Sequence, residues 1–207
     1  MKIDAPRLEE FESLLSLDAL PDEDEFEGLL LEGADLTGRD LHSREFRGCI
    51  LRKCTLTDCD LRRVGFTDVI LDHCDLSGAN LEDAVFVRSH ADVCRMTGAD
   101  LIHALLRQTR LTGCKLDFLN LAEAKCDHVL WENCILQEAS IESAALKAEF
   151  DRCDFTRATI YRTAMKGLDL RTCTLTGLSI GLGDLYGMVV TPLQAAELAR
   201  LMGLVIR

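Results

Sequence analysis

The sequence predicts an all-β fold in which short parallel strands wind into a coil with four sides. The first observation is a five-residue repeat: an apolar residue, usually large, returns at every fifth position from Leu31 to Leu185, with one short step of four. That period fits neither a helix, which needs apolar returns near 3.6 residues, nor a strand, which needs 2. It fits a chain that turns a corner every five residues.

Within each repeat the residue two positions before the large one is small, as at Ala34, Cys54 and Ala79. Alternation by two places both residues on the inner face of one side, as in a strand. The other three residues of the repeat then point outward.

Columns of like residues at a spacing of 20 indicate four sides in each coil. Phe46, Phe66 and Phe86 form one such column, and cysteines from Cys54 to Cys173 form another. Thirty-two repeats of this kind make eight coils. With neighbouring strands about 4.8 Å apart, the rod is expected to be about 38 Å long.

Glycine supports the corners. Nine of the fourteen glycines lie two residues after a large apolar position, where a positive φ is often needed and glycine adopts it without steric cost. The short step, between Leu146 and Phe150 beside Glu149, is interpreted as a tightened corner.

The ten cysteines lie in these repeat slots and not in a disulfide pattern. Nine of them stand two residues before a large position, and Cys126 stands on one. No pair has the spacing of a zinc site. The cysteines are therefore expected to be reduced and structural, acting as small apolar residues.

Composition indicates a soluble, cytoplasmic protein. No signal region opens the chain and no apolar run approaches the roughly 20 residues that span a bilayer. The net charge is −12, which argues against direct nucleic-acid binding. Residues 1–32 hold eleven acids and two bases, so most of the negative charge precedes the repeat.

Three segments follow from these patterns. Residues 1–28 form an acidic N-terminal cap, in which Leu8, Phe11, Leu14 and Leu15 have helical spacing. Residues 29–190 form the β-helix. Residues 191–207 form a C-terminal helix and a dimerisation tail.

The C-terminal helix has clear start and stop signals. Thr191 is the expected N-cap, Pro192 the first helical residue, Gln194 the capping-box partner and Gly203 the end. A stripe of Ala195, Leu198, Ala199 and Met202 is expected to close the last coil, and Leu193 and Leu201 lie away from it. The extra apolar residues predict a homodimer, with Leu193, Leu198, Leu201 and Met202 as its contacts.

The residues that catalysis would need are not arranged for it. The five histidines take outward positions, and none has a nucleophile and a carboxylate in triad order. No phosphate-binding or dinucleotide glycine motif occurs, and a filled coil offers no cleft. The prediction is a non-enzymatic protein without cofactor or metal, which acts through its surface.

The outward-facing charged residues are distributed unequally among the sides of the coil. The side of Leu36 carries six acids and three bases, the side of Leu41 seven acids and three bases, and the side of Phe46 six bases and four acids. Thirteen acids along the rod give roughly one per 3 Å, against one per 1.7 Å in duplex DNA, and net of bases the density is roughly one per 5 Å. The residues expected to bind a partner on the two acidic sides are Asp35, Asp40, Asp58, Asp60, Asp75, Glu82, Asp83, Asp100, Asp117 and Glu123. Ordinary solubilising charge in the slot before each large residue stays open as the alternative.

Two repeats, Gly33-Ala34-Asp35-Leu36-Thr37 and Gly78-Ala79-Asn80-Leu81-Glu82, show the pattern most plainly. They resemble the pentapeptide-repeat family, whose members form a right-handed quadrilateral β-helix. The resemblance covers about three quarters of the chain. It implies a solenoid of about eight coils with a C-terminal capping α-helix.

The end of the chain narrows this resemblance. Residues 163–170, 190–199 and 201–206 look like the C-terminal region of Qnr-type fluoroquinolone-resistance proteins, nearest to the loop-less chromosomal type of Gram-positive bacteria. That likeness implies dimerisation through the C-terminal helix, binding to DNA gyrase and topoisomerase IV by imitation of duplex DNA, and modulation of quinolone action. Here no inserted loop interrupts the repeat. The alternative is a pentapeptide-repeat interaction scaffold with no topoisomerase target.

Overall fold

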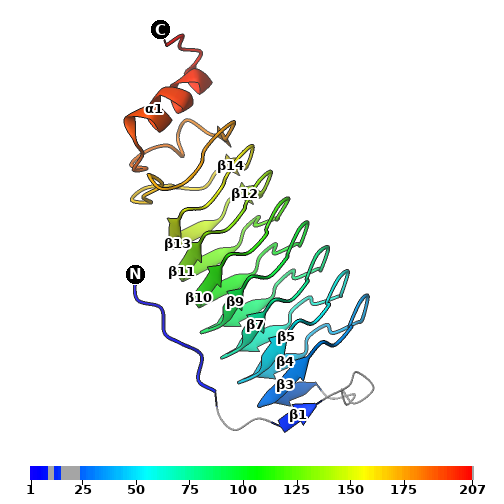
Figure 1. Cartoon of the computed structure of the whole chain (residues 1–207). Helices are drawn as coiled ribbons and strands as arrows, with labels where there is room; N and C mark the ends of the chain where they lie inside the picture. Colours follow the sequence, from blue (N-terminus) through cyan, green and yellow to red (C-terminus); the bar gives the residue numbers. More distant parts are fainter. Residues whose placement is uncertain (9–11, 15–23, 207) are drawn as a thin grey trace.

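The computed structural model describes residues 1–8, 12–14 and 24–206. It is a parallel β-solenoid in which each strand lies beside its equivalent in the next coil, with a helix at the C-terminal end (Figure 1). The strands are β1 (Glu12–Leu14), β2 (Glu25–Glu27), β3 (Leu29–Glu32), β4 (Glu45–Arg47), β5 (Ile50–Arg52), β6 (Gly65–Thr67), β7 (Ile70–Asp72), β8 (Val85–Val87), β9 (His90–Asp92), β10 (Leu105–Thr112), β11 (Lys125–Glu132), β12 (Ser140–Glu142), β13 (Ala145–Asp151), β14 (Thr159–Tyr161) and β15 (Ser179–Ile180). The expected all-β fold with four-sided coils is confirmed.

Residues that are 20 positions apart in the sequence pair with each other in neighbouring strands. Phe46 pairs with Phe66 and Phe66 with Phe86, and on an adjoining side Ile50 pairs with Ile70. From β10 onward one strand runs through both of these sides, as at Leu105–Thr112. The other two sides are held mainly by single bridges, such as that between Asp40 and Asp60.

Apolar side chains pack the coil interior, where a cavity of about 20 Å³ remains beside Phe66 and Phe86. The rings of Phe26, Phe46, Phe66 and Phe86 stack at centroid distances of 4.8, 5.3 and 5.1 Å. Trp131 is also buried and stacks on Phe150 at 5.9 Å. The predicted columns therefore form one continuous apolar core.

The cysteine ladder has a polar role that its spacing did not reveal. The nine cysteines that stand two residues before a large position each donate a weak hydrogen bond to a backbone carbonyl of the preceding coil, as from Cys74 Sγ to Leu51 O at 3.2 Å. Ser89 makes the same bond to Phe66 O at 2.9 Å. All ten cysteines are unpaired and buried, as predicted, and burial raises the pKa of the Cys126 thiol to about 12. The Cys126 thiol is therefore protonated at neutral pH.

The corners have left-handed backbone. All nine glycines predicted there have φ between 60 and 82°, and non-glycine residues such as Asp83 and His103 share the conformation with φ of 57 and 58°. The short step removes one corner residue: Asp127 pairs with Lys147, and Val129 pairs directly with Ala148. None of residues 147–149 has a positive φ, so β13 runs straight through the turn.

The N-terminal segment departs from its helical spacing. Glu12–Leu14 is strand β1, which pairs in parallel with β3 and covers the open edge of the first coil. Leu8 lies in a non-helical segment, while Phe11 and Leu15 lie outside the described residues. The helix expectation is therefore wrong at β1, because pairing an exposed strand edge outweighs local periodicity. Strand β2 continues the phenylalanine column at Phe26, within the segment assigned to the cap.

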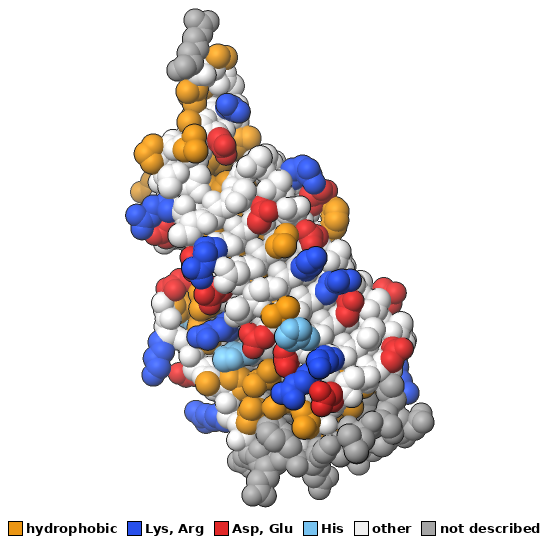
Figure 2. Space-filling model, in the orientation of Figure 1, with side chains coloured by type: hydrophobic (Ala, Val, Ile, Leu, Met, Phe, Trp, Pro, Cys, Tyr) orange, Lys and Arg blue, Asp and Glu red, His pale blue; other side chains and the backbone are white. Residues whose placement is uncertain are grey.

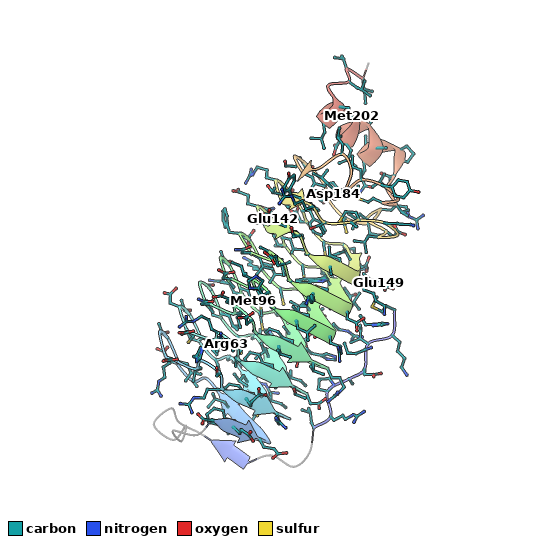
Figure 3. The ribbon with its side chains drawn as sticks, turned by 180° about the vertical axis from the view of Figure 1, so that it is seen from behind. Arg63, Met96, Glu142, Glu149, Asp184 and Met202 are labelled. Carbon is teal, nitrogen blue, oxygen red and sulfur yellow. The ribbon has the colours of Figure 1, made fainter. Side chains whose placement is uncertain are left out.

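Residues 1–8 form an extended strap that runs back along the rod beside the strands (Figures 1 and 3). The Arg7 N–H donates to Asp68 Oδ1, the Asp4 N–H donates to Gln108 Oε1, and the Met1 ammonium group contacts Glu149 Oε1. Three extended residues cover about 10 Å and two coils cover about 9.6 Å. The strap therefore meets the corner column of Asp68 and Gln108 at positions two coils apart, and reaches Glu149 in β13 two coils further on.

Asp68 anchors the strap at Arg7, and only 9% of Asp68 is exposed. Burial by itself would raise the pKa of the Asp68 carboxyl, but hydrogen bonds from the Arg88 guanidinium and the Arg7 N–H outweigh it and lower that pKa. A lowered pKa means that Asp68 contributes stability above the ordinary carboxyl pKa of about 3.9, and loses it as pH falls through the folded-state value.

We expect Asp68→Ala to detach the strap and to lower the free energy of unfolding by about 1–3 kcal/mol, because it removes a charge-assisted acceptor. Amide hydrogen exchange at Arg7 should accelerate at neutral pH, and the wild type should show the same release in acid. Asp58→Ala is the matched control, since Asp58 occupies an equivalent left-handed position at another corner, with φ of 55°, and is exposed. Equal effects of the two substitutions would contradict the anchor role.

The C-terminal helix closes the last coil as predicted, but through a different face. Helix α1 (Pro192–Ala199) has the expected capping box between Thr191 and Gln194, is followed by the 3₁₀ turn η2 (Arg200–Met202), and ends at Gly203 with φ of 77°. Its buried residues are Gln194 and Leu198, while Ala195 and Met202 are exposed. No helix in the described part of the chain is both long and apolar enough to cross a lipid bilayer.

Gln194 explains that difference. Its Nε2 donates to two buried carbonyl oxygens of the last coil, those of Leu170 and Cys173, both at 2.8 Å, and Leu170 O also accepts the Cys173 N–H at 3.0 Å. Satisfying two buried carbonyls decides which face of the helix packs, and periodicity of apolar residues does not report such a need.

Candidate interaction surface

The acidic side of the Leu41 column, here called the Asp40 face, is a straight row of outward residues. Bridges align Asp40, Asp60, Asn80, Asp100 and Asn120 in successive coils. Neighbouring coils are about 4.8 Å apart, so these side chains stand in one line along the rod. The fold therefore brings together Asp40, Asp60 and Asp100, with Glu82, Asp83 and Glu123 at the adjoining corner.

A local backbone requirement selects Asp or Asn in this row. The side-chain Oδ1 accepts the N–H of the residue two positions on, as from His42 to Asp40 at 3.0 Å and from Glu82 to Asn80 at 3.0 Å. This Asx turn holds the corner. An amide satisfies it as well as a carboxylate, so the choice of Asp adds charge that the turn does not need.

Arginines neutralise part of the Asp40 face. Arg62 Nη2 lies 2.5 Å from Asp60 Oδ2, and Arg63 Nε lies 3.8 Å from Asp83 Oδ2. The side-chain hydrogen bond from Arg62 lowers the pKa of Asp60 to about 2. Asp40 and Asp100, by comparison, have no cation within 4 Å among the described residues.

The other acidic side, here called the Asp35 face, is less continuous. Its bridged row runs Asp35, Thr55, Asp75, Arg95 and Lys115, so positive residues follow the acids, and Arg95 Nη1 lies 3.8 Å from Asp75 Oδ2. Asp58 and Asp117 lie elsewhere on this side, exposed and half-buried respectively. The face shown in Figure 2 likewise mixes acidic and basic side chains. The Asp40 face is the stronger candidate for a basic partner.

The C-terminal end carries a second surface. Leu193 is 73% exposed, Met202 56% and Leu201 43%, and Leu204, Val205 and Ile206 are exposed beyond them. Hydrophobic side chains gather at this end in Figure 2. Leu198, in contrast, is 7% exposed and packs on the last coil, so it is not available to a partner.

A groove of about 650 Å³ lies where the strap ends, lined in part by Glu149, Phe150, Asp169 and Arg171. Asp169 and Arg171 pair with each other at 2.7 Å. Its lining includes no histidine or cysteine, so the groove offers neither an imidazole base nor a thiol nucleophile.

Comparison with known proteins agrees with this geometry. A family model described as pentapeptide repeats matches in eight copies, over overlapping segments within residues 30–125. A comparison with curated protein sequences finds no significant match.

Several solved structures are similar. QnrB1, a plasmid-mediated fluoroquinolone resistance protein, is 21% identical over 95% of this chain and 98% of its own, with a TM-score of 0.43. HetL, involved in heterocyst differentiation regulation in the cyanobacterium Nostoc, is 22% identical over 80% and 89%, with a TM-score of 0.34. A protein of the Arabidopsis thaliana thylakoid lumen is 27% identical over 48% and 66%, with a TM-score of 0.42. With its five-residue repeat, its in-register coils and this family match, the chain is a pentapeptide-repeat protein.

Proposed function

We propose that this protein is a non-enzymatic rod that binds a type II topoisomerase, DNA gyrase or topoisomerase IV, through its Asp40 face and thereby modulates quinolone action. The observation that carries the proposal is the straight row of carboxylates at Asp40, Asp60 and Asp100, with Glu82, Asp83 and Glu123 beside it. The likeness of residues 163–170, 190–199 and 201–206 to Qnr-type proteins supplies the class of partner.

The electrostatics of the row suit a DNA-binding surface on the partner. A topoisomerase groove that holds duplex DNA is basic, and a fixed line of carboxylates can occupy it without a sugar-phosphate backbone. Arg62 and Arg63 lower the net charge of the row, so its affinity is expected to be more modest than that of DNA and to fall with added salt.

The exposed apolar residues at the C-terminal end support a homodimer. In such a dimer each of the two chains contributes its own Asp40 face. Stable interfaces bury about 800 Å² on each partner, and exposed apolar residues concentrate at this end of the rod. Leu193, Leu201 and Met202 are the proposed contacts. Leu198 is buried and packs the helix against the last coil.

Leu193→Glu combined with Met202→Glu is expected to give a monomer, because two carboxylates placed in an apolar interface have no partners. Light scattering coupled to size-exclusion chromatography measures this directly. Leu182→Glu is the control: it adds a charge at a residue that is 57% exposed and lies outside the helix. A monomeric wild type at micromolar concentration would refute the dimer.

The test of the partner is a gyrase supercoiling assay with and without ciprofloxacin, in which this protein is titrated. We expect a dose-dependent change in supercoiling or in the amount of drug-stabilised cleavage complex. No change in either quantity would exclude the topoisomerase and leave the alternative function, an interaction scaffold whose partner fits the mixed charges of the Asp35 face.

A further inference from the structure

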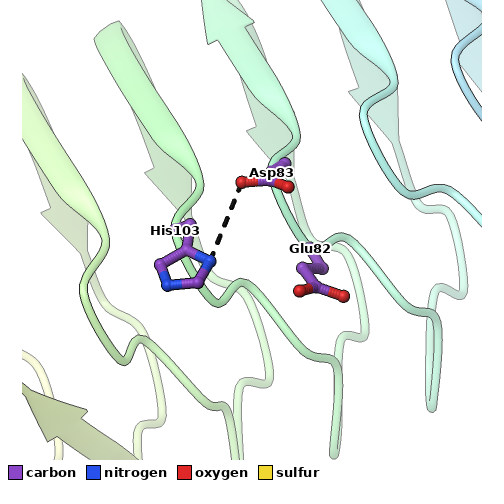
Figure 4. A group of neighbouring side chains, drawn as sticks. All are labelled: Glu82, Asp83 and His103. Atoms are coloured by element: carbon purple, nitrogen blue, oxygen red, sulfur yellow. Dashed lines mark ion pairs between the residues drawn. The ribbon is translucent and has the colours of Figure 1, made fainter.

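One cluster of side chains on the Asp40 face has the composition of a metal site. Glu82, Asp83 and His103 each place one potential ligand atom within 4.8 Å of the others (Figure 4). Asp83 and His103 occupy the same left-handed corner in successive coils, so their side chains leave the rod side by side. Glu82 is the residue before that corner. No other residues in the described part of the chain form such a group.

The His103 ring lies between two carboxylates. Its Nδ1 lies 3.7 Å from Asp83 Oδ1, and its Nε2 lies 3.5 Å from Glu123 Oε2 in the next coil. A histidine that binds a metal through one ring nitrogen almost always donates its other N–H to a carboxylate or carbonyl, which fixes the tautomer. The corner column supplies both partners, because Asp83, His103 and Glu123 are each 20 residues apart.

We propose that Glu82, Asp83 and His103 Nδ1 bind one divalent transition-metal ion of the zinc type, with Glu123 as the hydrogen-bond partner of Nε2. An imidazole with two carboxylates suits Zn²⁺, Co²⁺ or Ni²⁺, whereas Mg²⁺ and Ca²⁺ prefer oxygen alone. Zinc bonds of about 2.0–2.1 Å in a tetrahedron separate the ligand atoms by about 3.4 Å. The Asp83–His103 separation is already close to this value, and water completes the shell.

The surroundings permit entry of the ion. The side chains of Asp83 and His103 are each 44% exposed, so solvent reaches the ligand atoms. Arg63 approaches the other carboxylate oxygen of Asp83, Oδ2, at 3.8 Å, which leaves Oδ1 for the metal. A proton competes for the imidazole nitrogen, so metal affinity falls as the solution becomes acidic.

The test is isothermal titration of the full-length protein with ZnCl₂ at neutral pH, with the visible absorption of Co²⁺ as a second readout. We expect one zinc per chain and no saturable binding of Mg²⁺. His103→Asn and Asp83→Asn should each weaken zinc binding by tenfold or more, about 1.4 kcal/mol. Glu123→Gln should weaken it by about tenfold, as loss of an outer-shell partner does.

Asparagine keeps the left-handed corner, so the variants are expected to fold. His73→Asn is the matched control. His73 occupies an equivalent corner with φ of 55°, and its ring contacts the carboxylate of Asp72. It should bind zinc as the wild type does. Absence of saturable zinc binding, or binding that His103→Asn leaves unchanged, would overturn the proposal, since metal would then be bound elsewhere or not at all. The assay needs no topoisomerase, so its result is independent of the proposed function.

Discussion

The combined substitution of Asp40, Asp60 and Asp100 by asparagine is expected to weaken the effect of this protein on gyrase by at least tenfold. Each change removes one negative charge from the row that the proposed partner contacts. Close charge pairs in protein interfaces couple by about 1.5 kcal/mol or more, and a tenfold change in affinity is 1.4 kcal/mol. The measurement is the protein concentration that half-maximally alters supercoiling, at two salt concentrations.

The substitution is conservative for the fold. Asn80 and Asn120 already occupy this row and accept the same backbone N–H, from Glu82 at 3.0 Å and from Ala122 at 3.1 Å. The corners should therefore survive. Loss of activity in the triple variant would report on charge and not on unfolding, which circular dichroism can verify.

The control removes three charges from the side of the rod that carries β5, β7 and β9. Asp92, Asp151 and Asp169 lie there, and their replacement by asparagine changes the net charge equally. Near-wild-type activity is expected of this variant. Equal losses in both triple variants would mean that total charge matters and the Asp40 face does not. A wild-type result for the Asp40 face variant would place the interface elsewhere.

Phe66→Ala is expected to lower the free energy of unfolding by about 3–5 kcal/mol, the typical cost of emptying a fully buried aromatic site. Phe66 has no exposed surface and stacks between Phe46 and Phe86. Neighbouring coils are fixed by in-register pairing, so they cannot collapse into the cavity. Urea unfolding followed by circular dichroism gives the change.

Phe66→Leu is the matched control, because the same column continues with Leu106, which pairs beside Phe86. This change should cost clearly less than the alanine substitution, because it leaves a smaller cavity. If the leucine variant were as unstable as the alanine variant, the aromatic stack itself and not the filled volume would hold the column. If neither variant lost stability, the coil would be more deformable than its packing indicates.

Much of this fold is determined by the sequence alone. The columns, the left-handed corners and the capping box at Thr191 depend on residues within one repeat or one helical turn, or on their recurrence every 20 residues. Because the parallel coils are in register, a residue type that recurs at one position of the repeat forms a column along the rod. The acidic row followed in the same way, because its members share one slot of the repeat.

Contacts outside the repeat were decided by the tertiary structure. Strand β1 and the strap are set by an open sheet edge and by Asp68, Gln108 and Glu149, which lie far away in the chain. The packed face of α1 is set by two buried carbonyls to which Gln194 donates. That Asp83 lies near both Arg63 and His103 depends on side-chain directions at a corner, and five-residue periodicity carries no such information. The repeat specifies where each backbone lies, and the three-dimensional neighbours specify which side chains meet.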